Sequence, residues 1–197
     1  WIGAAAPDAN IVLASCDDSD SATFGPFTAA ANLLSGYVTP MPTVFSLSYG
    51  ECEAAGFVDG MANEAGDLWS QAAAEGVTVF VSSDDAGSAG CDQNEPAAYQ
   101  GIAVNGLAST PFNVAVGGTD FDDYNNQAQY WSQSNSSLYG SALSYIPEQT
   151  WNTSCASDTL DALLGYSNGV DACNSPSGQQ FLNTGGGGGG ASTNWFQ

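Results

Sequence analysis

The sequence contains no lysine, arginine or histidine among its 197 residues, whereas aspartate and glutamate together number 21. No side-chain ion pair can therefore form within the chain, so every buried carboxyl group must be protonated, hydrogen-bonded or bound to a metal ion. Nucleic-acid surfaces and phosphate clamps depend on Lys and Arg, so we expect no nucleic acid as a partner. A Ser-His-Asp or Cys-His catalytic site is excluded from this chain alone for the same reason.

Two kinds of explanation fit this charge balance. A protein that works at low pH would have many of its carboxyl groups protonated, which removes most of the negative charge. A segment bounded by cleavage at basic residues, or an edited or misread region, would also lack cations. The net charge of −21 at pH 7 further predicts a fold that is more stable near pH 4 than near pH 8, because folding concentrates like charges.

Length and composition indicate one compact globular domain, with 43% hydrophobic residues. No apolar run approaches the roughly 20 residues that span a bilayer, so we expect no membrane partner. The chain has five cysteines and neither a histidine nor a Cys-x-x-Cys pair, which favours disulfides over zinc and indicates a secreted or extracellular protein. An odd count leaves one thiol free or paired outside the chain.

Two cysteine pairs are expected from position. Cys155 and Cys173 bracket a short helix predicted over residues 158–164, and we expect them to be joined. Cys52 and Cys91 follow predicted neighbouring strands, and we expect them to lie close together.

Over the first 120 residues, short apolar runs alternate with helical stripes. The runs at 11–15, 44–49, 77–82 and 113–116 predict strands, and the stripes at 27–34 and 57–72 predict helices that end at Gly36 and Gly76. This alternation predicts an α/β fold, a doubly wound and mostly parallel sheet covered by helices on both faces.

The second part of the chain is rich in Asn, Ser, Gln and aromatic residues and shows little periodicity, which predicts long surface loops. Gly185 to Gly190 is a run that cannot hold a fixed shape without external contacts. We therefore interpret residues 1–197 as a single, incomplete domain. Residues 1–120 form its α/β core, and residues 121–197 form a loop-rich insertion with a glycine-rich tail.

Three polar clusters follow the predicted strands at the point where each strand ends. They are Ser48-Tyr49-Gly50-Glu51, Ser82-Ser83-Asp84-Asp85-Ala86-Gly87 and Gly117-Gly118-Thr119-Asp120. One such cluster alone is an ordinary exit from a strand. Because the carboxyl ends of parallel strands meet at one edge, where ligands bind, the three together predict a site with Gly50 and Asp85 at a common edge.

The order and spacing of four segments resembles the sedolisin (serine-carboxyl peptidase) family over roughly the first 120 residues. The segments are Ala5-Ala6-Pro7-Asp8-Ala9-Asn10-Ile11-Val12-Leu13, Phe45-Ser46-Leu47-Ser48-Tyr49-Gly50, Val81-Ser82-Ser83-Asp84-Asp85-Ala86-Gly87 and Val114-Ala115-Val116-Gly117-Gly118-Thr119. The stretch from Tyr145 to Cys173 is similar to an insertion found in some bacterial members.

This resemblance implies a subtilisin-like fold and a secreted, acid serine-type endopeptidase that acts on peptides or proteins. The family attacks the peptide carbonyl with a serine whose base is a glutamate, itself supported by an aspartate. Asp85 matches the further aspartate whose protonated carboxyl stabilises the oxyanion. Ser48, Tyr49 and Gly50 match the extended segment that pairs with the substrate backbone. Asp84 stands where the family usually has glycine.

The nucleophile and the Glu/Asp pair of the family are not evident in the sequence. The pair lies on a helix before the segment that Trp1 to Ala9 resembles, and the nucleophile lies in a later Gly-Thr-Ser motif followed by a calcium site. Ser192, in Gly190-Ala191-Ser192, is the candidate nucleophile that the chain offers, although the expected small residues and proline do not follow it. We therefore expect the middle of a peptidase domain, inert alone. No metal or cofactor is expected in this chain, with calcium possible in the complete domain.

Two other classes of function remain open at this point. An extracellular structural or adhesive protein derived from a peptidase fold is compatible with the lack of basic residues, the many Tyr and Asn, and the glycine run, and it would self-associate. A small-molecule-binding doubly wound domain is less compatible. Gly117-Gly118-Thr119 is not a dinucleotide-binding motif, and a P-loop requires a lysine.

Overall fold

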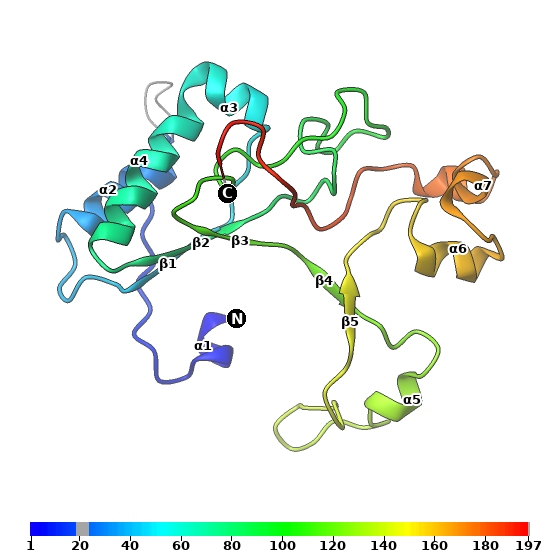
Figure 1. The fold of residues 1–197 in the computed structure, drawn as a ribbon. Helices are drawn as coiled ribbons and strands as arrows, with labels where there is room; N and C mark the ends of the chain where they lie inside the picture. The colour runs from blue at the N-terminus through cyan, green and yellow to red at the C-terminus, as the bar shows by residue number, and fades with distance from the viewer. Residues whose placement is uncertain (19–23, 197) are drawn as a thin grey trace.

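The computed structural model describes residues 1–18 and 24–196 of the chain (Figure 1). Helices and strands are mixed along the sequence. In chain order they are α1 (Ile2–Ala5), α2 (Gly25–Leu34), β1 (Val44–Leu47), α3 (Glu53–Asp59), α4 (Met61–Ala74), β2 (Thr78–Ser82), β3 (Val114–Val116), β4 (Thr119–Phe121), α5 (Gln127–Tyr130), β5 (Glu148–Thr150), α6 (Asp158–Leu164), α7 (Gly169–Cys173) and the 3₁₀ helix η1 (Gly178–Phe181).

The main sheet has three strands in the order β1-β2-β3, and both neighbouring pairs are parallel. Phe45 lies opposite Val79, and Val81 lies opposite Ala115. The predicted α/β class and the parallel sheet are therefore confirmed. Since all three strands run the same way, their carboxyl ends share one edge of the sheet.

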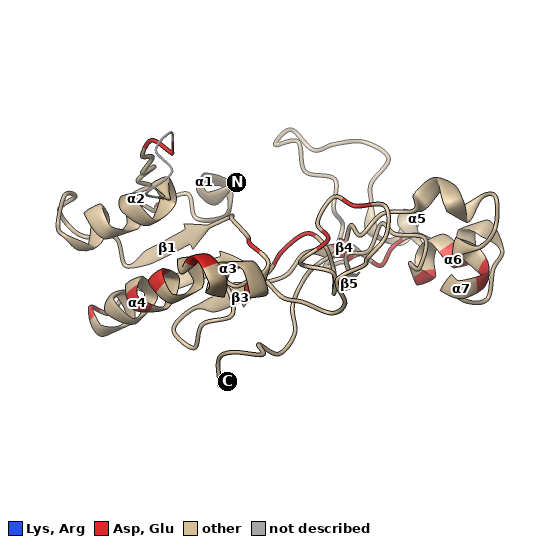
Figure 2. Ribbon diagram, turned by 90° about the horizontal axis from the view of Figure 1, so that it is seen from above, with Lys and Arg blue, Asp and Glu red and all other residues tan. Residues whose placement is uncertain are grey.

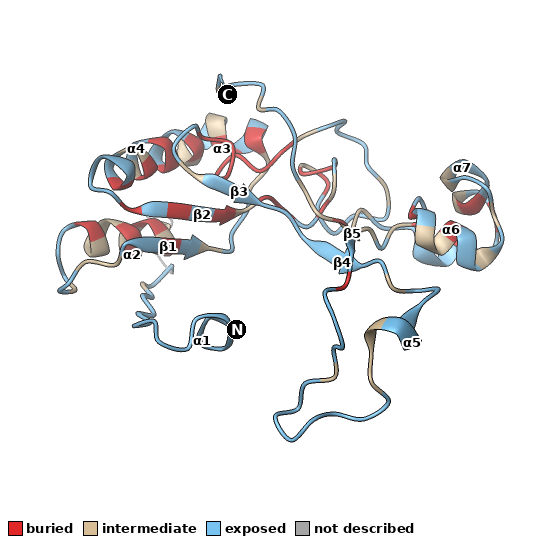
Figure 3. Cartoon of the chain, turned by 60° about the horizontal axis from the view of Figure 1, so that its bottom comes forward, coloured by how far each residue is buried: buried red, intermediate tan, exposed pale blue. Residues whose placement is uncertain are grey.

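Helices α2 and α4 pack on one face of this sheet (Figure 3). Val79 and Val81 of β2 point into this layer and are almost fully buried, together with Phe27 of α2 and Trp69 of α4. Burial alternates along β2, as expected for a strand with one covered face.

The other face of the sheet is open among the described residues, so the expectation of helices on both faces is not met. Thr78, Phe80 and Val114 are exposed, and no described helix packs over them (Figure 3). The physical reason lies in the connections. The segment from β1 to β2 contains α3 and α4, whereas the segment from β2 to β3 forms loops without a helix.

The prediction of a buried strand over residues 11–15 is wrong. These residues adopt no regular structure, and the side chain of Leu13 is 93% exposed. An apolar run becomes a buried strand only if a neighbouring strand and a covering layer are present. The described part of the chain shows no backbone hydrogen bond from this run to another strand.

The single helix predicted over residues 57–72 is two helices. Helix α3 ends at Gly60, which has φ of 93°, and α4 begins at Met61. A left-handed residue terminates an α-helix, and glycine adopts this conformation without a steric penalty. Helix α2 and the end of α4 near Gly76 agree with the prediction.

The second part of the chain is more structured than predicted. Strands β4 and β5 form an antiparallel pair, and α6 matches the predicted helix, whereas α5, α7 and η1 were not expected. The elements from β4 to η1 extend away from the parallel sheet, whereas the glycine-rich tail returns to it (Figure 1). It still consists mainly of loops, as the composition predicts.

Two disulfides join the cysteine pairs that were expected to meet. Cys52 is bonded to Cys91, and Cys155 is bonded to Cys173, whereas Cys16 is free. The second bond ties the start of the α6 segment to the end of α7.

The acidic residues of the described ranges lie on helices, on loops and on the antiparallel strands β4 and β5, and not on the parallel strands (Figure 2). Strands β1 to β3 contain no Asp or Glu. In the described ranges, no helix is long and apolar enough to cross a membrane.

Candidate functional site

The carboxyl ends of β1 and β2 are held together by one buried side chain, Asn105. Its amide nitrogen donates to the carbonyl oxygen of Tyr49 at 3.0 Å and to that of Ser82 at 2.7 Å. Its amide oxygen accepts from the backbone nitrogens of Glu51 at 3.1 Å and Leu107 at 2.9 Å. The Asn105 side chain, 1% exposed, therefore makes four hydrogen bonds and fixes the spacing of the two polar clusters.

No feature of the sequence indicated this role for Asn105. A single asparagine before a glycine predicts a turn, and its partners lie far away in sequence. Only the fold reveals that this amide matches two carbonyls and two N–H groups at the edge of the sheet.

Ser48, Tyr49 and Gly50 are exposed at this edge, directly after β1. The ring of Tyr49 packs edge-on against Phe24, with ring centroids 5.2 Å apart. Little room exists beside Gly50, where a Cβ would lie 3.1 Å from the amide nitrogen of Asn105. The segment is thus exposed at a position that its neighbours fix, with the carbonyl of Tyr49 bonded to Asn105.

Asp84 forms a buried turn directly after β2. Its φ is 104°, a region that favours glycine and that other residues rarely adopt. One carboxyl oxygen of Asp84 accepts from the backbone nitrogens of Asp85 and Ala86 and holds the turn. Burial raises the pKa of Asp84, and the nearby Asp85 charge adds to this effect, although the two N–H groups oppose it.

Asp85 is exposed on this turn, at the same edge of the sheet as Ser48 to Gly50. Its backbone carbonyl accepts from the nitrogen of Gly186 at 3.0 Å, so its backbone is fixed while its side chain faces outward. The predicted common edge of Gly50 and Asp85 is therefore present in the fold. A carboxyl in this position is available to a bound molecule, and it donates a hydrogen bond only when protonated.

The glycine run that was expected to need external contacts has them. The nitrogen of Gly188 donates to the carbonyl of Asp84 at 2.9 Å, and Ser83 Oγ donates to the carbonyl of Gly188 at 2.7 Å. A Cβ on Gly188 would lie 2.3 Å from the carbonyl oxygen of Ser83, so no side chain fits there. Glycine is required because two backbones lie in direct contact.

The hydroxyl of Ser192, the candidate nucleophile, is not free. Its Oγ donates to Oε1 of Glu53 and accepts from the backbone nitrogens of Asn194 and Trp195. Glu53 is 4% exposed and lies at the start of α3. The hydroxyl is therefore occupied on both its donor and acceptor sides.

Glu51 is an unusual carboxyl next to this site. Its Oε2 is buried and has no hydrogen-bond partner among the described residues. Burial, and then the neighbouring carboxyl of Asp59, raise the pKa of Glu51 to about 7. The protonated form is thus favoured below neutral pH, which no feature of the sequence indicated.

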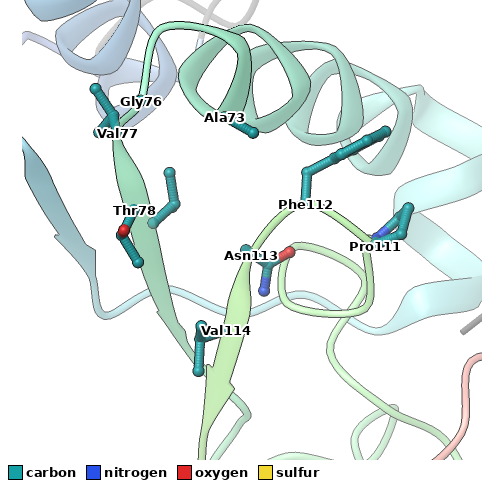
Figure 4. Close-up of a pocket in the computed structure, with 9 residues that line it drawn as sticks. Ala73, Gly76, Val77, Thr78, Pro111, Phe112, Asn113 and Val114 are labelled. Carbon is teal, nitrogen blue, oxygen red and sulfur yellow. The ribbon is translucent and has the colours of Figure 1, made fainter.

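A hollow of about 440 Å³ lies at the opposite end of the sheet, between the end of α4 and the start of β3 (Figure 4). Most of its lining is apolar. Its amide side chain, Asn113, is already used, since Nδ2 donates to the Ala108 carbonyl and Oδ1 accepts from Thr110. The hollow therefore offers no free polar group of that kind to a ligand.

In the described parts of the chain, no three His, Cys, Asp or Glu side chains are arranged to hold a metal ion. The groups that the carboxyl edge presents are carboxyl, hydroxyl and backbone groups. Such an edge suits the recognition of an extended peptide through its backbone, with Asp85 beside it.

Fold and edge together define an α/β protein with a parallel sheet and a polar carboxyl edge. No family model matches the chain, and no curated protein matches it. Among solved structures, the chain is similar to Pseudomonas sedolisin, a serine-carboxyl proteinase solved with two molecules of pseudo-iodotyrostatin. The two are 24% identical with a TM-score of 0.47, over 78% of this chain and 41% of that chain. The chain therefore spans less than half the length of that structure.

Proposed function

We propose that this chain is the central part of an acid serine-type endopeptidase domain of the sedolisin kind, and that it binds the substrate backbone but does not cleave it alone. The observation that carries the proposal is the position of the two matching motifs. Ser48 to Gly50 and Asp85 lie at the ends of adjacent parallel strands, and Asn105 fixes the distance between those strands.

Asp85 is the proposed oxyanion stabiliser. Its side chain faces solvent, while its neighbour Asp84 is buried and bonded within the turn. A protonated carboxyl at Asp85 would donate to the oxygen that becomes negative as the peptide carbonyl is attacked. A carboxyl donates such a hydrogen bond only in its protonated form, so an oxyanion stabiliser of this type suits a peptidase that works at acid pH.

Ser48, Tyr49 and Gly50 are the proposed substrate-binding segment. They directly follow Leu47, the last residue of β1, and are exposed. An extended peptide that pairs with this backbone would place its carbonyl near the neighbouring Asp85 turn.

The nucleophile, its glutamate base and the supporting aspartate are proposed to lie in flanking parts of a longer polypeptide. The hydrogen bond from Ser192 to Glu53 is one that a serine and its glutamate base also form. What argues against Ser192 as the nucleophile is that its Oγ also accepts from the backbone nitrogens of Asn194 and Trp195. A secreted location is part of the proposal, and the two disulfides fit an oxidising compartment.

Peptide titration at pH 4, followed by the backbone amide resonances of the 197-residue chain, tests the binding part of the proposal. We expect shifts at Ser48, Tyr49, Gly50 and the Asp85 turn, without hydrolysis. Helix α6, which lies away from the sheet (Figure 1), serves as the internal reference and should not shift. Shifts confined to α6, or no shift at any residue, would contradict the proposal.

A further inference from the structure

The last part of the chain, residues 184–195, runs across the site from the Asp85 turn to helix α3. We refer to it as the strap. It has two sets of contacts, separated by Gly189 and Gly190, which have φ of 142° and 138°. The two ends of the strap are therefore held, and its middle is exposed.

The first set of contacts joins the strap to the turn after β2. Backbone hydrogen bonds link Gly186 to Asp85 and Gly188 to Asp84, and Gly87 donates back to Gly186 at 3.0 Å. The strap and the turn thus form one hydrogen-bonded unit. A displacement of the strap would move the backbone on which Asp85 is carried.

The second set of contacts centres on the carboxylate of Glu53. Its Oε1 accepts from Ser192 Oγ, and its Oε2 accepts from the backbone nitrogen of Thr193 at 3.0 Å and from Thr193 Oγ1 at 2.8 Å. Hydrogen bonds to an ionised acceptor are stronger than neutral ones. This carboxylate is satisfied entirely by neutral donors, since the chain has no cation to offer it.

The position of Glu53 is itself fixed. It follows Cys52, which is bonded to Cys91, and its backbone nitrogen donates to the Val104 carbonyl at 3.0 Å. Beyond Thr193, the ring of Trp195 lies against Phe57 of α3, with centroids 5.8 Å apart, and so covers the end of the strap. The backbone that carries Glu53 is therefore held in place relative to the sheet.

We propose that Glu53 is the latch of the strap, the residue whose carboxylate holds the strap in place, and a positioning residue for the Asp85 turn, and that Ser192 is its hydrogen-bond partner. The latch follows from the contacts alone. Its relevance to catalysis rests on the proposed function, because only that proposal gives Asp85 a role.

The hydrogen bonds between the Glu53 carboxylate and the strap should persist at acid pH. Burial acts to raise the pKa of Glu53, but the hydrogen bonds from Ser192, Thr193 and Ser109 outweigh it and leave the pKa below its ordinary value. The carboxylate therefore remains an acceptor at a pH where ordinary glutamates are protonated.

Amide hydrogen exchange in the full 197-residue chain at pH 5 tests the latch without any need for activity. In Glu53→Gln, one acceptor oxygen becomes a donor that faces Ser192 or Thr193. We expect the amides of Gly186, Gly188 and Thr193 to exchange about 10- to 100-fold faster, the change that corresponds to the loss of a hydrogen bond to a charged group. The exposed Glu64→Gln is the matched control and should leave these amides unchanged.

A second variant covers the case in which Glu53→Gln loosens the whole fold. Thr193→Val removes one donor at an exposed residue and leaves the buried carboxylate in place, so the β2 amides of Val79 and Val81 should keep their protection. Thr193→Ser, which keeps the hydroxyl, should restore the slow exchange of the strap. Unchanged strap exchange in Thr193→Val, or strap and β2 amides that accelerate equally in it, would overturn the proposal.

Discussion

The side-chain nitrogen of Asn105 lies 3.0 Å from the carbonyl oxygen of Tyr49, although 56 residues separate the two in sequence. The same nitrogen lies 2.7 Å from the carbonyl of Ser82, at the end of the neighbouring strand. This buried amide thus links the proposed substrate-binding segment to the strand that leads into the Asp85 turn, together with a longer hydrogen bond from Ser82 Oγ to the Tyr49 carbonyl at 3.4 Å.

Replacement of Asn105 by alanine should be strongly destabilising. It removes the Asn105 partner of two backbone N–H groups and two carbonyls, of which the Tyr49 carbonyl keeps a longer bond from Ser82 Oγ, and we expect a loss of at least about 2 kcal/mol in the free energy of unfolding. Urea denaturation of Asn105→Ala measures this loss. The exposed Asn126→Ala is the control and should change stability by less than about 0.5 kcal/mol. Equal, small effects in the two variants would show that the bridge is unimportant.

The pKa of Glu51, raised to about 7, predicts a pH-dependent stability. A carboxyl whose pKa is higher in the folded than in the unfolded state contributes stability that is complete below about 4.5 and is lost as pH rises through 7. Through Glu51, the unmodified chain should lose on the order of 2 kcal/mol in the free energy of unfolding between pH 5 and pH 8, and Glu51→Gln should not show this loss. Thermal melts across this range, with the exposed Glu64→Gln as the control, measure the difference.

The same melts test the wider expectation that the chain is more stable near pH 4 than near pH 8. Glu51 and Asp84, whose pKa values are raised, act in that direction, whereas Glu53 and Asp92, whose pKa values are lowered, act against it. A melting temperature that climbs steadily to pH 8 would show that hydrogen-bonded carboxylates outweigh the repulsion.

The two disulfides should each contribute about 3–4 kcal/mol, since they close loops of 39 and 18 residues. Removal of the longer one, as Cys52→Ala with Cys91→Ala, should lower stability slightly more than removal of the shorter one. Peptide mapping without reductant checks the pairing, and free thiols at both 155 and 173 would refute it. Replacement of the free Cys16 by alanine is the control.

We expect the buried carboxyl group of Asp161 to lower the free energy of unfolding. It is 3% exposed, and neither carboxyl oxygen has a hydrogen-bond partner among the described residues. Asp161→Leu should therefore raise the free energy of unfolding at pH 7 by about 1–3 kcal/mol. The exposed Asp158→Leu on the same helix is the control and should not stabilise. A destabilised Asp161→Leu would mean that water or a cation satisfies the carboxyl.

The parallel sheet could be predicted because its strands alternate with helical stripes, and the polar clusters could be placed because the carboxyl ends of parallel strands coincide. The sequence could not show that the run at 11–15 has no strand partner, because an apolar run indicates a preference for burial and not the presence of a neighbouring strand. The division between α3 and α4 was readable at Gly60, because glycine often ends a helix.

The supporting residues of the site were beyond prediction. Asn105 and Glu53 each act on partners more than 50 residues away, and hydrogen bonds over such distances leave no periodic pattern. The glycine run predicted a need for external contacts, but its partner, the Asp84 turn, became visible only in the fold.

The most direct test of the account is the hydrolysis of an unstructured peptide at pH 4 by the polypeptide that carries residues 1–197 together with the proposed flanking segments. We predict that Asp85→Ala lowers kcat about 10²- to 10³-fold, that Asp158→Ala has no effect, and that residues 1–197 alone show no activity. Full activity in Asp85→Ala, or cleavage by residues 1–197 alone that is abolished by Ser192→Ala, would contradict the account.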